Sequence, residues 1–151
     1  MLERLKGYLI RQDKRPTPTD LLTNIDVRLL LSQDYWLEQP KKHPAVAEAL
    51  QASGRCDLWA EEAGKALEAD GYKGVFLKKW KGDMGVKKWL WDTHYVWQHQ
   101  YIELHCEEGR RYIADGTAGQ FFDSGSDYHN GYFGFVDEAP PVLQAIYNYN
   151  E

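Results

Sequence analysis

Three residues of this chain, Cys56, His99 and Asp115, have the types that nucleophilic thiol chemistry needs. A cysteine thiolate is a nucleophile, a histidine can accept and donate a proton, and a carboxylate can orient the histidine and stabilise its charged form. Taken singly, each residue has an ordinary structural explanation. Their joint order is more specific: a cysteine at a predicted helix start, a histidine on a predicted strand, and an aspartate at the end of the next strand. We interpret this order as catalytic.

The turn between the two strands predicts how His99 meets Asp115. It ends in Gly109, which suits a three-residue turn with glycine at positive φ. That turn sets a register in which Asp115 lies opposite Tyr101 and diagonal to His99. Diagonal Cβ atoms are about 7–8 Å apart, a gap that aspartate and histidine side chains can close. A two-residue turn would instead move Asp115 to the other face of the sheet.

The expected helix start at Cys56 favours a thiolate. A helix N-terminus stabilises negative charge, Arg55 adds a positive charge, and a paired imidazolium lowers the thiol pKa further. The backbone N–H of Cys56 can donate to an oxyanion, and Gln120 can supply a second donor from its side-chain amide.

Other polar and aromatic residues receive different interpretations. Alternation along the strand makes Cys106 a core residue. The histidines of this strand are too far apart to hold zinc together, so we expect no metal and no other cofactor. Trp89, Trp91 and Trp97 lie next to the expected site and are candidates for substrate contact.

The remaining sequence predicts an α+β fold, with N-terminal helices and a nucleophile-bearing helix packed on an antiparallel sheet. We expect one thiol-hydrolase-like domain over 1–151, consisting of a leader (1–18), a helical region (19–53) and a catalytic core (54–151). The first expected helix covers 20–36 and is capped by Thr19; its apolar face consists of Leu21, Leu22, Ile25, Leu29 and Leu30. Further helices are expected over 45–53, from Cys56 to Gly71, and, as a short closing helix, within 139–150. Strands are expected at 73–80, 93–106 and 110–115, with a polar loop or hairpin at 81–92 and a Gly-rich loop at 124–134.

Composition excludes several classes of function. The chain has 151 residues, with 43% hydrophobic and 14% aromatic content, which argues against disorder. A net charge of −5 is unsuited to general nucleic-acid binding. We expect no membrane span and no classical signal peptide, so the protein is expected in the cytoplasm of the producing cell or exported without such a signal.

The segments GRCDLWAEEAGKALEADGY, HQYIEL and RRYIADGTAGQF resemble the papain-like and transglutaminase-like thiol hydrolases. Within them the chain is most similar to bacterial toxin and effector domains that deamidate protein glutamines. The resemblance covers roughly 54–122. It implies a papain-like fold with Cys56 as nucleophile, His99 as base, Asp115 as orienting acid and Gln120 as oxyanion donor. One departure is Gly116, where the family prefers proline.

The resemblance implies hydrolysis of protein amide groups through a thioester, with glutamine deamidation favoured. A cysteine peptidase or isopeptidase, or a transglutaminase, is the alternative enzyme. A non-catalytic protein-binding module of the same fold is the alternative of another class. The expected partner is a protein substrate and, if the chain is a toxin, a cognate inhibitor or immunity protein.

Overall fold

The computed structural model describes residues 21–51, 56–89, 92–122, 125–128 and 130–149, with the side chains of 83–97 left undescribed. These residues form an α+β fold of five α-helices and one four-stranded antiparallel sheet. The elements in chain order are α2 (Asn24–Leu31), α3 (Gln33–Lys42), α4 (Pro44–Gln51), α5 (Cys56–Ala69), β1 (Phe76–Trp89), β2 (Asp92–His105), β3 (Arg111–Asp115), the 3₁₀ helix η1 (Ala118–Phe121), β4 (Tyr132–Phe135), the 3₁₀ helix η2 (Val136–Glu138) and α6 (Pro141–Tyr147).

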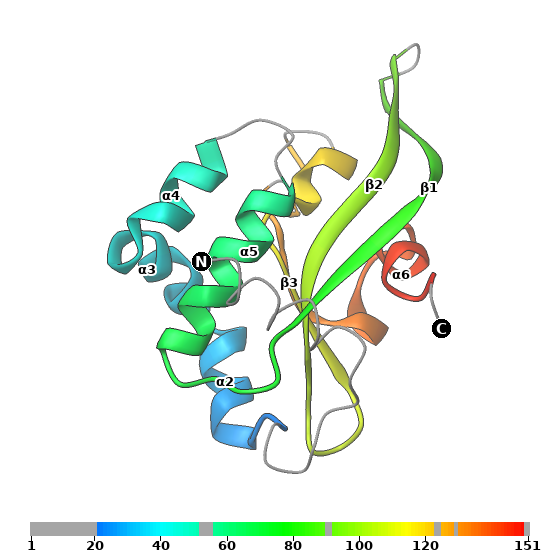
Figure 1. Ribbon diagram of the computed structural model, residues 1–151. Helices are drawn as coiled ribbons and strands as arrows, with labels where there is room; N and C mark the ends of the chain where they lie inside the picture. Colours follow the sequence, from blue (N-terminus) through cyan, green and yellow to red (C-terminus); the bar gives the residue numbers. More distant parts are fainter. Residues whose placement is uncertain (1–20, 52–55, 90–91, 123–124, 129, 150–151) are drawn as a thin grey trace.

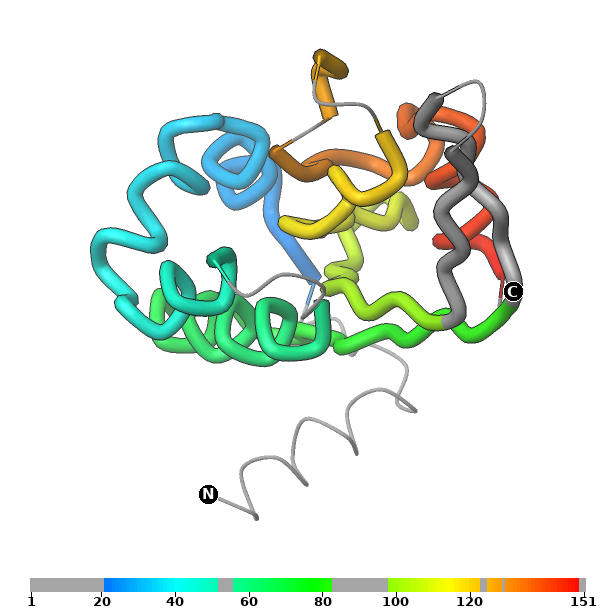
Figure 2. The backbone as a smooth tube through the Cα atoms, turned by 90° about the horizontal axis from the view of Figure 1, so that it is seen from above, coloured from blue at the N-terminus to red at the C-terminus, as the bar shows by residue number. Residues whose placement is uncertain are grey.

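The elements form three layers (Figure 1). Helices α2 to α5 lie on one side of the sheet, whose strand order is β1-β2-β3-β4, and α6 lies on the other side. The view from above in Figure 2 separates the same two groups, with the blue-to-green helices at one side and the red α6 at the other. The paired strands β1 and β2 extend beyond the other strands as a long twisted hairpin.

Successive side chains along the strands point to opposite faces of the sheet and pack into two separate hydrophobic cores. Ile102 and Leu104 of β2 point toward the helical layer, where they pack with Trp59 and Leu67 of α5. The next residues along the strands point the other way. Tyr101 and Ile113 pack with the residues of η1, η2 and α6, which include Ala118, Phe121, Leu143 and Tyr147. Because β2 and β3 are covered on both faces, polar side chains in this region are taken out of water and need partners.

The predicted register of the β2–β3 hairpin is confirmed. Ile102 pairs with Ala114 and His105 pairs with Arg111. Gly109 has φ +78°, a conformation that suits glycine, and its N–H donates to the carbonyl of Cys106 across 3.0 Å. The turn therefore fixes the face of the sheet on which each later residue of β3 lies.

The helix that begins with Cys56 also matches its prediction, since α5 begins at Cys56 and ends at Ala69. At its end, Gly71 has φ +100° and the N–H of Tyr72 donates to the carbonyl of Leu67 at 3.0 Å. This closure by a left-handed glycine is a common way to end a helix.

The first helical region differs from its prediction. Instead of one helix over 20–36 there are two, because the chain breaks at Ser32, whose φ of −71° and ψ of 127° are extended. The N-cap is Thr23, which forms a capping box with Asp26; the predicted cap, Thr19, lies outside the described residues. The predicted apolar face is also wrong in part, since Ile25 and Leu29 are 72% and 52% exposed.

Of the two alternatives expected for 81–92, the structure shows the hairpin, since β1 continues to Trp89 and pairs with β2. One strand of the sheet was not predicted. β4 begins inside the segment expected to be a Gly-rich loop (124–134) and pairs with β3, from Tyr112 opposite Phe135 to Asp115 opposite Tyr132. None of the helices in the described ranges has the length and apolar character that crossing a membrane requires.

Candidate active site

His99 of β2 and Asp115, the last residue of β3, form a buried pair. His99 Nε2 lies 2.6 Å from Asp115 Oδ2, and both side chains have no solvent exposure. The confirmed register places these residues on the same face, as the predicted diagonal arrangement requires. Phe121 packs edge-on against the imidazole, with ring centroids 5.0 Å apart. The pair is therefore an ionisable unit closed off from water.

Both oxygens of the Asp115 carboxylate are engaged. Besides the contact with His99, Oδ2 accepts a hydrogen bond from the hydroxyl of Tyr147 at 2.7 Å. Oδ1 faces the backbone N–H and the hydroxyl of Thr117, at 3.3 and 3.4 Å. A buried carboxylate is stable only when it has such partners, and these partners also fix its orientation toward the histidine.

Cys56 is the thiol that the structure brings to His99. It is the first residue of α5 and is half-buried. The backbone of Gln100 hydrogen-bonds to Cys56. Gln100 lies in β2 just before Ile102, where the pairing with β3 begins. Burial alone would raise the pKa of the Cys56 thiol. The hydrogen bond and charge of His99, together with the Gln100 backbone, outweigh burial and lower that pKa.

The same contacts raise the pKa of His99. Burial disfavours the imidazolium, but the charge and hydrogen bond of Asp115, with a further contribution from Cys56, raise the pKa to about 9. The pKa of the thiol is lowered and that of the imidazole is raised, and both shifts favour a thiolate–imidazolium pair. A thiolate of this kind is a competent nucleophile.

Gln120, from η1, lies against the same imidazole. Its Nε2 is 2.9 Å from His99 Nδ1 and 3.1 Å from the carbonyl of Thr117. Nε2 of His99 is held by Asp115, so Nδ1 is the nitrogen that can exchange a proton with the thiol. An imidazolium has no lone pair at Nδ1 for an amide N–H. Forming the ion pair therefore requires that Gln120 turn its amide or move away from the ring.

Gly116, the departure from the family pattern, has a structural reason. A Cβ at this position would lie 2.4 Å from Cε2 of Trp59. Trp59 belongs to α5, three residues after Cys56, and its side chain is 1% exposed. The turn that follows Asp115 thus packs directly on the nucleophile helix, and a proline there would overlap the indole.

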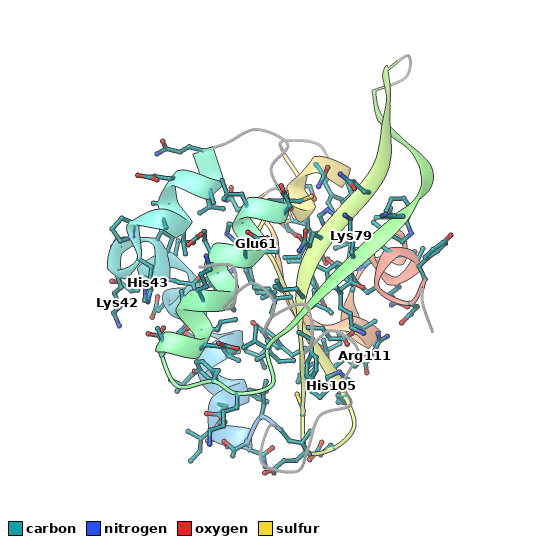
Figure 3. The ribbon with its side chains drawn as sticks, in the orientation of Figure 1. Lys42, His43, Glu61, Lys79, His105 and Arg111 are labelled. Atoms are coloured by element: carbon teal, nitrogen blue, oxygen red, sulfur yellow. The ribbon has the colours of Figure 1, made fainter. Side chains whose placement is uncertain are left out.

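A second ionic cluster holds α6 in place. Glu103, 1% exposed, accepts from Arg111 Nη1 at 3.0 Å and lies 3.0 Å from His105 Nε2 and 3.6 Å from Lys78 Nζ. Arg111 also donates to the backbone carbonyl of Tyr147, at the end of α6, at 3.0 Å. Figure 3 shows Arg111 and His105 near each other below α6. His105 therefore belongs to this cluster and not to the His99 site.

The remaining predicted residues separate into two groups. Cys106 is buried in the core between the sheet and helices α2 to α5, as predicted, and burial raises the pKa of its thiol. Trp89, Trp91 and Trp97, the predicted substrate contacts, have side chains outside the described residues.

Two further features of the described residues concern binding sites outside the Cys56 region. No three His, Cys, Asp or Glu side chains gather there in a way that could hold a metal ion. A hollow of about 270 Å³ is lined by Lys42, His43 and Lys65, among others. Its α5 residues lie between Glu62 and Ala69, away from Cys56 at the helix start. Figure 3 shows Lys42 and His43 at the outer side of the helical layer.

No protein-family model, curated protein or solved structure matches this chain. The family resemblance of its motifs therefore remains a hypothesis that rests on the residues themselves.

Sequence reasoning did not identify Thr117 and Tyr147. The spacing Asp-x-Thr is a recognisable signal for a turn in which a carboxylate accepts from the residue two positions later, so Thr117 was within reach of the sequence. Tyr147 carries no such signal. It shares the apolar pattern of Leu143 and Ile146 in α6, and only the fold shows where its hydroxyl points.

Proposed function

We propose that this protein is a Cys-His-Asp thiol hydrolase of the papain-like and transglutaminase-like kind that acts on protein amide groups, most specifically on the side-chain carboxamide of glutamine. The observation that carries the proposal is the contact of the Cys56 thiol with an imidazole that is itself bound to a buried carboxylate. A thiol, an imidazole and a carboxylate that contact one another in this order can catalyse acyl transfer.

The reaction follows from the charges of these groups. The Cys56 thiolate attacks the carbonyl carbon of the amide, and the resulting oxyanion accepts from the Cys56 N–H and from Gln120 once it has left His99. His99 gives its Nδ1 proton to the departing nitrogen, the C–N bond breaks, and a thioester remains. His99 then takes a proton from water, the hydroxide attacks, and the C–S bond breaks. For a glutamine substrate the products are glutamate and ammonia.

The position of Gln120 supports a carboxamide substrate. Its own side-chain amide nitrogen lies 2.9 Å from Nδ1 of His99, where the nitrogen of a departing group must receive its proton. A substrate glutamine that replaced Gln120 would present a group of the same chemistry to the same nitrogen.

The test has one part that needs no substrate. Cys56 and Cys106 are both free, so each can react with iodoacetamide, and the labelled peptide identifies the thiol. We expect fast labelling of Cys56, slow labelling of the buried Cys106, and loss of the fast phase in His99→Gln. Equal, slow labelling of both thiols would reject an activated nucleophile and would favour the protein-binding module.

The second part identifies the reaction. Glutamine-containing proteins are incubated with the wild type and with Cys56→Ala, and their intact masses and free ammonia are measured. Deamidation adds about 1 Da for each glutamine without cutting the chain, because –NH₂ is replaced by –OH. Fragments would instead identify a peptidase, and crosslinked species a transglutaminase.

A further inference from the structure

Tyr147 is buried in the core that the sheet forms with η1, η2 and α6. Its hydroxyl has no part in the proposed reaction. Its ring packs against Tyr101, with centroids 4.7 Å apart, and against Tyr132 at 6.2 Å. Packing alone needs no hydroxyl. The hydroxyl nevertheless donates to Oδ2 of Asp115, the same oxygen that binds His99.

The position of this hydroxyl is fixed from the other end of the residue. The backbone carbonyl of Tyr147 accepts from Arg111, which is anchored in turn by the buried Glu103. Arg111 begins β3 and Asp115 ends it, so the strand that carries the carboxylate also holds the helix that carries the tyrosine. The hydroxyl and the carboxylate are thus parts of one rigid arrangement.

We propose that Tyr147 is a positioning residue for the thiol hydrolase reaction: it holds the Asp115 carboxylate in the orientation that binds the imidazolium of His99. This inference rests on the proposed function. The carboxylate can turn about its Cβ–Cγ bond. Thr117 holds Oδ1 across 3.3 and 3.4 Å, which are long contacts, whereas Tyr147 holds Oδ2 across 2.7 Å. Removing the Tyr147 hydroxyl removes the shorter restraint and weakens the bond to His99.

The consequence reaches Cys56 through the imidazole. A carboxylate that is free to turn stabilises the imidazolium less, so the pKa of His99 falls. The thiolate then loses its charged partner, and the pKa of Cys56 rises. The Tyr147 hydroxyl acts on the imidazole and the thiol through Asp115, which accepts its hydrogen bond, so its effect should appear in the pH dependence of thiol reactivity.

The experiment measures the rate of iodoacetamide labelling at Cys56 against pH in the wild type, Tyr147→Phe and Tyr132→Phe. Tyr132→Phe is the matched control, because its hydroxyl donates to the backbone carbonyl of Phe135 in the same core and does not contact Asp115. In Tyr147→Phe we expect the labelling midpoint to move up by about 1 pH unit and the rate at neutral pH to fall about tenfold. Tyr132→Phe should keep the wild-type profile, although both variants lower the melting temperature.

The outcomes separate the two proposals. If Cys56 of the wild type labels no faster than Cys106, the proposed function fails. If it labels fast and Tyr147→Phe keeps the wild-type pH profile, the function stands and the role of Tyr147 is overturned. If Tyr147→Phe does not fold, proton NMR of the wild type replaces it. The Tyr147 hydroxyl resonance should shift when Cys56 is alkylated, and a resonance that does not move refutes the coupling.

Discussion

Substituting Gly116 by alanine tests the contact between the turn after Asp115 and α5, the helix that begins with Cys56. An added Cβ would lie 2.4 Å from Cε2 of Trp59 and 2.7 Å from two further ring atoms. Carbon atoms in contact prefer separations of about 3.5–4.0 Å, so the deficit exceeds about 1 Å. Trp59 is 1% exposed and cannot move outward freely. Overpacking of this kind costs about 1–3 kcal/mol, and a loss of about 2 kcal/mol lowers the melting temperature of a domain of this size by about 4–8 °C.

The assay is urea and thermal unfolding of Gly116→Ala beside Gly125→Ala. Gly125 is exposed and has nothing within 4 Å of an added Cβ, so its substitution changes only the backbone. A second comparison is made in a Trp59→Leu background, which removes the ring that the new methyl group meets. There the penalty of Gly116→Ala should shrink to a few tenths of a kcal/mol, a coupling expected for residues in contact. A penalty equal to that of Gly125→Ala, or one unchanged by Trp59→Leu, would refute the packing argument.

Three further predictions concern the site and the cluster beside it. The proposed reaction needs a Cys56 thiolate and a His99 imidazolium. As the pH increases, the rate of amide hydrolysis should therefore rise through the lowered pKa of Cys56 and fall above about pH 9. A rate that is still rising at about pH 10 would contradict the ion pair. Gln120→Ala should lower kcat by about 10²–10³ while Cys56 labelling persists, and a loss in kcat below about threefold would exclude an oxyanion role. Burial would raise the pKa of Glu103, but His105, Lys78 and Arg111 lower it below 4.5. Ionised Glu103 therefore stabilises the fold above about pH 4.5, and this stability is lost as the pH falls through its folded pKa. Glu103→Gln should cost about 3 kcal/mol near neutral pH and remove that acid-dependent loss in urea unfolding, whereas an unchanged acid limb would refute the assignment.

The parts of the site that the sequence predicted depend on local rules. Gly109 fixes the turn, the turn fixes the register, and the register brings Asp115 to the face of His99. The start of α5 at Cys56 follows from helical spacing and from Gly71 at the other end. Each of these inferences needed only neighbouring residues or one hairpin.

The parts that the sequence did not predict depend on contacts between distant elements. Ile25 and Leu29 stand at helical spacing from each other, yet they remain exposed, because α2 ends before Ser32 and turns Leu30 to the core. β4 was missed because glycines surround it, and it is a strand because β3 offers it an edge. The place of Gln120 against His99 likewise depends on how η1 folds back over β2.

The order of the elements along the chain also determines when each part of the site is synthesised. Cys56, His99 and Asp115 are synthesised before Tyr147, so the carboxylate cannot gain its 2.7 Å partner until α6 has been made. A nascent chain that stops short of α6 would lack the hydroxyl that we propose positions Asp115, so the carboxylate would be without its shorter restraint.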